Sequence, residues 1–145
     1  MSANHKLALV GAGVIGKHHG RVISQLADRV DLVAVADPQG DRAAQLTAEH
    51  GGRPYGSLTE ALAAEEIDIV VVCTPTGRHG EVAVEALGAG KHVIVEKPAE
   101  ITVERTDEII KARDQAGNIS AEQTREIVVQ SLLLPISPPN LQVVP

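Results

Sequence analysis

Three glycines near the N-terminus, Gly11, Gly13 and Gly16, constrain the fold of this chain more than any other feature of the sequence. They directly follow a short apolar run, Leu7 to Val10, and a helical pattern of apolar residues begins within the next few positions. A strand, a tight turn and a helix N-terminus in immediate succession are typical of the first unit of a parallel α/β sheet. The sequence therefore predicts that the chain opens with such a unit.

Each glycine of this G-x-G-x-x-G spacing has a physical task if the turn binds a dinucleotide. We expect Gly11 to allow a sharp turn, Gly13 to let the backbone approach a pyrophosphate, and Gly16 to let the helix lie close to the sheet. The free N–H groups at the helix start, at Val14 and Ile15, then face the phosphates together with the positive end of the helix dipole. The spacing alone is a weak signal, since glycine-rich turns occur in many proteins.

A second apolar run strengthens the prediction, because it ends at Asp37, roughly 20 residues after Gly16. An acidic residue at this distance accepts hydrogen bonds from the adenosine ribose in dinucleotide sites. Its charge also repels a 2′-phosphate, so we expect NAD to be the cofactor and NADP to be less favoured. Arg42 lies close in the sequence and could attract that phosphate, which argues the other way. The alternative is a plain tight turn, with Asp37 serving only as a helix cap before Pro38.

The composition suits one domain with an aliphatic core. The chain has 145 residues, is 43% hydrophobic and 22% charged, and carries Tyr55 as its one aromatic residue of the Phe, Trp and Tyr types. A core of Ala, Val, Ile and Leu is typical of buried parallel strands. The scarcity of aromatic residues and the formal net charge of −6 argue against nucleic acid or an anionic membrane as partners.

The cysteine content and the N-terminus indicate a cytoplasmic protein. Cys73 is the single cysteine, so no disulfide framework exists, and the sequence contains no zinc-ligand pattern. The first residues lack the pattern of a signal peptide, and no apolar run approaches the roughly 20 residues needed to span a bilayer. We therefore expect a cytoplasmic chain with no metal.

Strand-like and helix-like stretches alternate along residues 1–117. The predicted strands after the first cover 30–36, 53–55, 68–73 and 92–95. The predicted helices cover 14–27, 39–50, 57–65 with a capping box at Ser57, 80–89, and 102–116 with Thr102 as the cap. This alternation predicts an α/β fold with a doubly wound parallel sheet, the Rossmann arrangement.

Four separate stretches fall at the carboxyl ends of the predicted strands. They are the glycine turn, Asp37, the loop 74–79, and the segment from Glu96 to Pro98. Ligands of open parallel sheets bind beyond the carboxyl ends of the strands. We therefore expect all four stretches to line one cleft.

Together these motifs resemble those of the Gfo/Idh/MocA oxidoreductases, a family that includes glucose–fructose oxidoreductase and inositol 2-dehydrogenase. The matching pieces are Gly11-x-Gly13-x-x-Gly16-x-x-His19, Ala36-Asp37, Thr74-Pro75-x-x-x-His79 and Ala89-Gly90-Lys91-His92-Val93-x-x-Glu96-Lys97-Pro98. The resemblance covers roughly residues 1–117 and implies a Rossmann domain that binds NAD or NADP. In the family, a larger second domain follows and usually supplies the substrate pocket and the dimer face.

The resemblance also implies roles for two neighbouring residues. Lys97 is expected to lie beside the nicotinamide and the substrate hydroxyl as the catalytic residue, and Glu96 is expected to help hold the nicotinamide ribose. Elementary chemistry agrees, because an ammonium group shielded from water beside a cofactor gives up its proton more readily. The alternatives are a surface lysine at a strand end and a simple ion pair between Glu96 and Lys97.

Further cofactor contacts implied by the resemblance lie in the loop after the fourth predicted strand, at Thr74, Pro75, Thr76 and His79. Thr76 stands where the family often has asparagine. His79 is expected either to contact the ligands or to pack against the following helix. Of the two histidines in the first helix, His18 and His19, we expect one to be exposed and one to be packed.

The family pattern ends at Asn118. Residues 118–145 contain either a helix over 121–134 or a sixth strand at 127–129, and the proline-rich end is expected to be a mobile tail. The sequence thus predicts no second domain, which leaves a truncated or frame-shifted copy or a natural short module. The apolar stretch 127–134 predicts self-association through this end unless it packs on the sheet.

These features predict an NAD(P)-dependent dehydrogenase domain that transfers hydride between the nicotinamide and a polyol or sugar-like alcohol. The alternative is a non-catalytic dinucleotide-binding or interaction module. Because the substrate domain of the family is missing from the predicted architecture, we expect the isolated chain to bind cofactor but to turn over weakly or not at all.

Overall fold

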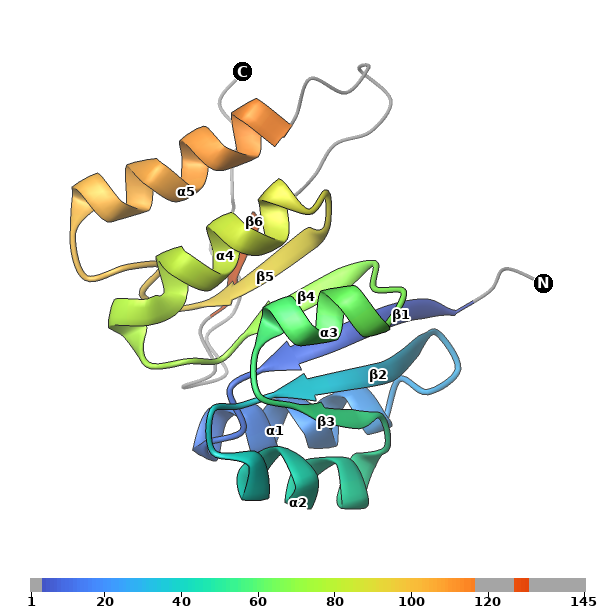
Figure 1. The fold of residues 1–145 in the computed structure, drawn as a ribbon. Helices are drawn as coiled ribbons and strands as arrows, with labels where there is room; N and C mark the ends of the chain where they lie inside the picture. The colour runs from blue at the N-terminus through green and yellow to red at the C-terminus, as the bar shows by residue number, and fades with distance from the viewer. Residues whose placement is uncertain (1–3, 117–126, 131–145) are drawn as a thin grey trace, which may run out of the picture.

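The computed structural model describes residues 4–116 and 127–130 and contains one parallel sheet within them (Figure 1). The described strands lie in the order β3-β2-β1-β4-β5-β6. Their bounds are β1 (His5–Val10), β2 (Val30–Ala36), β3 (Arg53–Tyr55), β4 (Ile69–Val72), β5 (His92–Glu96) and β6 (Ile127–Gln130). This order, with every described pair parallel, is that of a Rossmann sheet.

Helices cover both faces of the sheet. Their bounds are α1 (Val14–Ser24), α2 (Gly40–His50), α3 (Leu58–Ala64), α4 (His79–Gly88) and α5 (Val103–Ala116), with a short 3₁₀ helix, η1 (Thr76–Arg78), before α4. Figure 1 shows α1 and α2 on one side of the sheet and α3, α4 and α5 on the other. The predicted doubly wound α/β fold is therefore confirmed.

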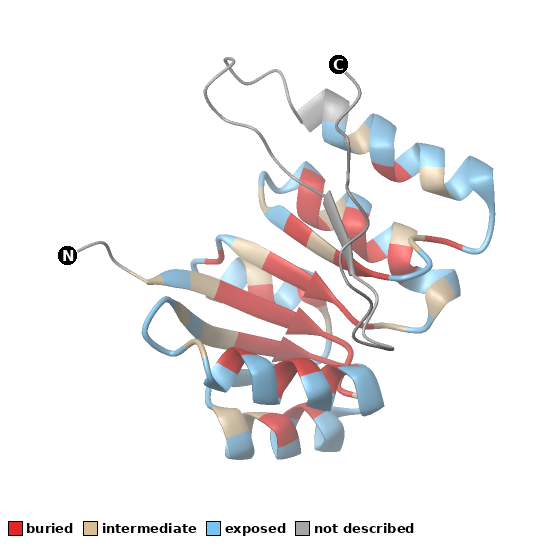
Figure 2. Cartoon of the chain, turned by 180° about the vertical axis from the view of Figure 1, so that it is seen from behind, coloured by how far each residue is buried: buried red, intermediate tan, exposed pale blue. Residues whose placement is uncertain are grey.

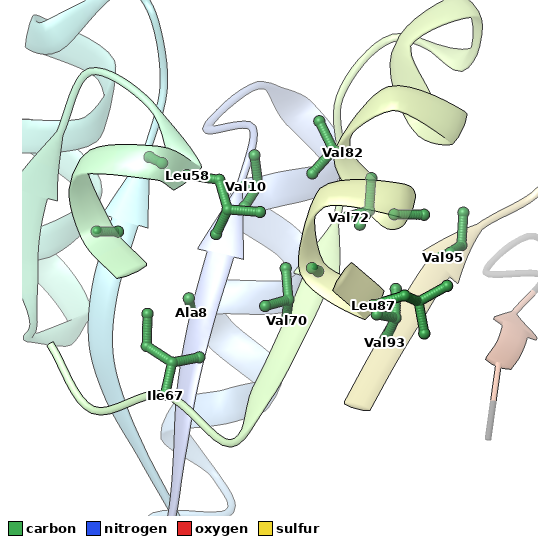
Figure 3. Close-up of a cluster of buried hydrophobic side chains, with 14 of the residues drawn as sticks. Ala8, Val10, Leu58, Ile67, Val70, Val72, Val82, Leu87, Val93 and Val95 are labelled. Carbon is green, nitrogen blue, oxygen red and sulfur yellow. The ribbon is translucent and has the colours of Figure 1, made fainter. Parts of the chain in front are cut away.

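The buried side chains of the strands alternate between the two faces of the sheet and form two clusters. Ala8 and Val10 of β1 belong to the cluster under α3, α4 and α5, which Figure 3 shows in close-up. Leu7 and Leu9 belong to the second cluster, together with Ile23 of α1. Successive side chains of a strand point to opposite faces, so one strand supplies both layers. Figure 2 shows the buried residues running along the strands and the inner sides of the helices.

Several predicted helix boundaries differ from those in the structure. The first helix ends at Ser24 rather than near residue 27, because the N–H groups of Gln25 and Leu26 donate to the carbonyl oxygens three residues earlier and the chain tightens into turns. At α3 the predicted cap is present, since Ser57 Oγ accepts from the N–H of Glu60. The Glu60 carboxylate reaches back one residue further than expected, to the N–H of Gly56.

The C-terminal strand resolves an alternative that the sequence left open. Residues 127–130 form β6, which pairs in parallel with β5 and starts with Ile127 opposite Val93. A helix over 121–134 is therefore wrong for these residues. Consecutive β-branched residues at 127–129 favour a strand, because their side chains lose freedom in a helix. The rest of 117–145, including the predicted tail, lies outside the described residues.

The sheet topology creates a crevice between β1 and β4. These two strands are neighbours, but the chain leaves β1 toward β2 on one side and reaches β4 only later, on the other side. The strand ends are tied by backbone hydrogen bonds, from the N–H of Gly11 to Ala36 O at 2.8 Å and from the N–H of Cys73 to Val10 O at 2.7 Å. Such a topological switch point is where open α/β sheets bind ligands.

Gly16 lacks a side chain where the helix meets the glycine turn, and this contact is closer than any contact with the strands of the sheet. A Cβ atom on Gly16 would lie 1.9 Å from the carbonyl oxygen of Gly11. The Gly11 backbone has no room to move away from such a Cβ. It has φ +99°, and a Cβ on Gly11 itself would lie 2.6 Å from the backbone of Cys73. The predicted close approach is therefore present, but its partner is the backbone of the glycine turn.

We expect Gly16→Ala to lower the free energy of unfolding by roughly 3 kcal/mol, because the new methyl group meets backbone that has no room to move. Urea denaturation followed by circular dichroism measures this change. Gly13→Ala is the matched control, since a Cβ on Gly13 meets nothing within 4 Å, and its cost should stay below about 1 kcal/mol. Equal midpoints for the two variants would contradict the prediction.

Candidate functional site

A cavity of about 380 Å³ opens at the carboxyl edge of the sheet, at the crevice between β1 and β4. Its volume is in the range of small-molecule and cofactor pockets. Every predicted site residue except Gly16 lines it. These are Gly11, Gly13, Val14 and Ile15 from the glycine turn and α1; Thr74, Pro75, Thr76 and His79 from the segment after β4; and Asp37, Glu96 and Lys97. The expected convergence on one cleft is therefore present.

The start of α1 presents an anion-binding surface to the cavity. Gly13 is the N-cap residue, and open space lies in front of it where a side chain would stand. The first turn of α1 contains no acidic residue, and Val14 is 85% exposed. The first N–H groups of a helix lack intrahelical partners and carry the positive end of its dipole. This part of the cavity therefore fits a diphosphate.

Asp37 joins the glycine turn to the segment before α2. Its carboxylate accepts from the N–H of Ala12 through Oδ2 and from the N–H of Gln39 through Oδ1, each at 2.8 Å. The residue is only 7% exposed, yet it lines the cavity. The N-cap of α2 is Gln39, so Asp37 lies before the helix and braces the turn instead of capping the first helical turn. Each carboxylate oxygen can accept a second hydrogen bond, so Asp37 can still bind hydroxyl groups.

Two cationic side chains flank the glycine turn on the solvent side. Arg42, in the first turn of α2, lines the main cavity and also an adjoining hollow of about 250 Å³. Lys17 of α1 lines the same hollow, and its Nζ lies 3.4 Å from Gln45 Oε1. Sequence reasoning noted Arg42 only as a neighbour of Asp37 and did not include either cation in the site. Their positive charges complement an anion placed at the turn.

Cys73 and Thr74 form part of the cavity wall at the end of β4. Cys73 was not predicted as a site residue, and its position here follows from the strand ending one residue earlier. Burial raises the pKa of the Cys73 thiol, and the nearby charge of Glu96 adds to this, so the thiol stays protonated and is a poor nucleophile. Thr74 Oγ1 is buried and has no hydrogen-bond partner among the described residues.

His79 holds two loops of the site together. Its ring is 2% exposed, with Nδ1 lying 2.9 Å from Pro98 O and Nε2 lying 2.7 Å from Thr74 O. A neutral imidazole carries one N–H and donates to one of these carbonyl groups. The structure thus favours the packing alternative, since both ring nitrogens face backbone oxygens from the loops after β4 and β5.

Glu96 and Lys97 are neighbours at the end of β5 with opposite environments. Glu96 is 7% exposed and its Oε1 lies 2.7 Å from Nε2 of His19, whereas Lys97 is exposed. Among the described residues, the side chain that contacts the Glu96 carboxylate is His19 and not Lys97, so the simple ion pair between the two neighbours is wrong. His19 is the packed histidine of α1, as expected, and His18 is exposed. The described residues do not shield the Lys97 ammonium from water.

The hydrogen-bonding groups that line the cavity fit a dinucleotide. A helix N-terminus with open space before it suits the diphosphate, and two buried carboxylates, Asp37 and Glu96, suit ribose hydroxyl groups.

Residues 4–113, whose side chains are described, bring together no group of three His, Cys, Asp or Glu side chains placed to hold a metal ion. In the described part of the chain, no helix combines the length and apolarity needed to cross a membrane.

Comparison with known proteins finds one family over most of the chain. Residues 5–124 match the family model GFO_IDH_MocA, described as "Oxidoreductase family, NAD-binding Rossmann fold". The match includes the glycine turn, Asp37, the loop after β4 and the segment from Glu96 to Pro98.

Individual relatives are full-length dehydrogenases that this chain matches in part. The 4-carboxy-2-hydroxymuconate-6-semialdehyde dehydrogenase of Sphingobium sp. is 34% identical over 113 residues, which cover 77% of this chain and 36% of the relative. Inositol 2-dehydrogenase of Rhizobium meliloti is 39% identical over 106 residues, covering 73% and 32%. The solved WlbA dehydrogenase of Bordetella pertussis, in complex with NADH and UDP-GlcNAcA, gives a TM-score of 0.77 at 37% identity, covering 81% and 35%. The chain spans about a third of the length of these relatives.

We expect Gly13→Val to lose NAD binding, by more than about 100-fold in affinity, because the side chain fills the space where the diphosphate approaches the turn. The fold should persist, since a Cβ at this position meets nothing within 4 Å and the backbone has an extended conformation with φ −75°. Isothermal titration calorimetry measures the affinity.

Gly40→Val is the matched control for this substitution. Gly40 starts α2, a Cβ there also meets nothing within 4 Å, and the residue does not line the cavity. Its NAD affinity should equal that of the unmodified chain. Unchanged affinity in Gly13→Val would remove the diphosphate from this turn.

Proposed function

The chain belongs to the Gfo/Idh/MocA family of oxidoreductases, and we propose that residues 1–117 form an NAD-binding domain for hydride transfer with a polyol or sugar-like alcohol. The observation that carries this proposal is that one cavity at the switch point gathers Gly13, Asp37, Glu96 and Lys97. One site thus contains protein groups that can bind a diphosphate, accept hydrogen bonds from ribose and transfer a proton.

In this proposal each end of the cavity binds a different part of the cofactor. The start of α1 at Gly13 holds the diphosphate, and Asp37 accepts from the hydroxyl groups of the adenosine ribose. Glu96 accepts from the ribose on the nicotinamide side. The nicotinamide, when bound, supplies the hydride acceptor or donor. Thr74 lies along the same wall of the cavity.

Lys97 is the group proposed to handle the proton. With a bound nicotinamide to take the hydride from the C–H bond of an alcohol, the amine of Lys97 would accept the O–H proton of that alcohol. In the reverse direction the ammonium returns that proton to the carbonyl oxygen. Lys97 is exposed at the cavity mouth, so the cofactor and substrate themselves must shield it when they bind.

The class of substrate is supported by what the relatives act on or bind. Several are inositol 2-dehydrogenases, and the WlbA structure contains NADH and UDP-GlcNAcA. Inositol is a cyclic polyol, and the second ligand is a nucleotide sugar. Both carry ring hydroxyl groups, which supports a secondary alcohol on a ring as the reacting group here.

We expect NAD to bind more tightly than NADP by about 2 kcal/mol, because Asp37 accepts from the ribose hydroxyls and repels a 2′-phosphate. Titrations of the same protein with both cofactors measure the ratio of affinities. Asp37→Asn should bring that ratio close to one. Asp41→Asn makes the same change of charge at an exposed residue of α2 and should leave the ratio unchanged. Equal or tighter binding of NADP to the unmodified chain would contradict the prediction.

We expect the isolated chain to bind NAD but to produce NADH at a rate near background. Positioning of a substrate can supply about 7–11 kcal/mol of a barrier, and the described residues leave Lys97 exposed rather than enclosed. A spectrophotometric assay across inositols, sugars and diols measures turnover.

Lys97→Ala is the control for chemistry, and it should retain NAD affinity within about twofold. Robust turnover that disappears in this variant would show that the chain alone completes a catalytic site. Cofactor binding without turnover is the expected outcome for the isolated chain, and it is shared by the alternative function, a non-catalytic dinucleotide-binding module. Absence of binding to either cofactor would contradict both.

A further inference from the structure

The side chain of His19, on α1, contacts the carboxylate of Glu96. We propose that His19 is a positioning residue that aligns this carboxylate for the ribose on the nicotinamide side. The inference rests on the proposed cofactor site and adds a residue that lies outside the cavity. Among the described residues, His19 is the one side chain that binds the Glu96 carboxylate.

The contact between His19 and Glu96 is short and buried. Nε2 of His19 lies 2.7 Å from Oε1 of Glu96, and each side chain is 9% exposed. His19 follows Gly16 by three positions, so both lie on the same face of α1. Gly16 brings that face against the glycine turn, and His19 then reaches the end of β5. The helix that presents the diphosphate site therefore also fixes a carboxylate at the other end of the cavity.

The contact leaves the second oxygen of Glu96 for a ligand. Within the described residues Oε2 makes no hydrogen bond, and Glu96 lines the cavity. A glutamate side chain has several rotatable bonds, and ordering it on ligand binding costs free energy. When His19 donates to Oε1, the position of Oε2 is largely set before the ligand arrives. Glu96 lines the cavity together with Cys73, the residue that follows β4.

A purely structural role is the competing explanation, in which the pair only fastens α1 to the sheet. The two roles differ in their dependence on the ligand. A structural defect in α1 weakens every ligand that uses the glycine turn, including those without a second ribose. A positioning defect weakens only ligands that carry the ribose bound by Glu96.

Three ligands of increasing length separate these roles: ADP, ADP-ribose and NAD. We expect His19→Leu, which keeps apolar volume and removes the donor, to lose about tenfold in affinity for ADP-ribose and NAD, the effect of one hydrogen bond to a charged group. Its affinity for ADP should stay within about twofold, because ADP lacks the second ribose. Calorimetric titrations of the full 145-residue chain give all three values.

Two further variants make the test specific. His19→Gln keeps an N–H donor on a flexible side chain and should restore NAD affinity to within about threefold of the unmodified chain. His18→Ala changes the neighbouring exposed histidine and should leave all three affinities unchanged. Glu96→Gln should reproduce the ligand pattern of His19→Leu, and combining the two should add little further loss.

An equal loss of affinity for all three ligands in His19→Leu would overturn the positioning role, as would unchanged NAD affinity in that variant. If His19→Leu does not fold, Glu96→Gln and His19→Gln decide the question. In that case Glu96→Gln must weaken NAD and ADP-ribose but not ADP, and His19→Gln must bind all three. Failure of the unmodified chain to bind any of the three ligands would overturn the proposed cofactor site itself, and the positioning role with it.

Discussion

The close backbone contact at the glycine turn is the constraint on which the site depends. Cβ positions on Gly11 and Gly16 would fall 2.6 Å from the backbone of Cys73 and 1.9 Å from the carbonyl oxygen of Gly11. The end of β4, the turn and the start of α1 therefore approach at distances that no side chain allows. This contact places the open backbone at Gly13 opposite the loop after β4, and the cavity lies between them.

A second layer of interactions fixes the carboxylates that face the cavity. Asp37 is held by the N–H groups of Ala12 and Gln39, and Glu96 is held by His19. Both carboxylates are 7% exposed, and burial of an unpaired charge would be costly, so these hydrogen bonds offset part of the cost of burying the two groups. Because the groups are ordered beforehand, less conformational entropy is lost when a ligand binds.

The sequence predicted what local pattern determines and missed what depends on distant contacts. Glycine spacing and apolar alternation are local signals, and they located the turn, the strands and the convergence at one edge. The pairing of His19 with Glu96 joins residues 77 positions apart, so no local pattern indicates it. For His79 the sequence allowed either ligand contact or packing, and the contact of its Nδ1 with Pro98 O, 19 positions later, favours packing. In the last described segment, the sequence allowed a helix or a strand, and the pairing of residues 127–130 with β5 decides for β6.

Glu96 and Lys97 line the same cavity at the end of β5, but their side chains lie in different environments. Glu96 ends the strand, is buried and has a fixed partner, whereas Lys97 follows it and is exposed. The groups proposed to hold the cofactor are therefore ordered by contacts within the described residues. The group proposed to move the proton is not, and its environment depends on whatever covers the cavity mouth. In the proposed function, cofactor affinity is thus a property of the domain itself, while the rate of proton transfer depends on the shielding of one lysine.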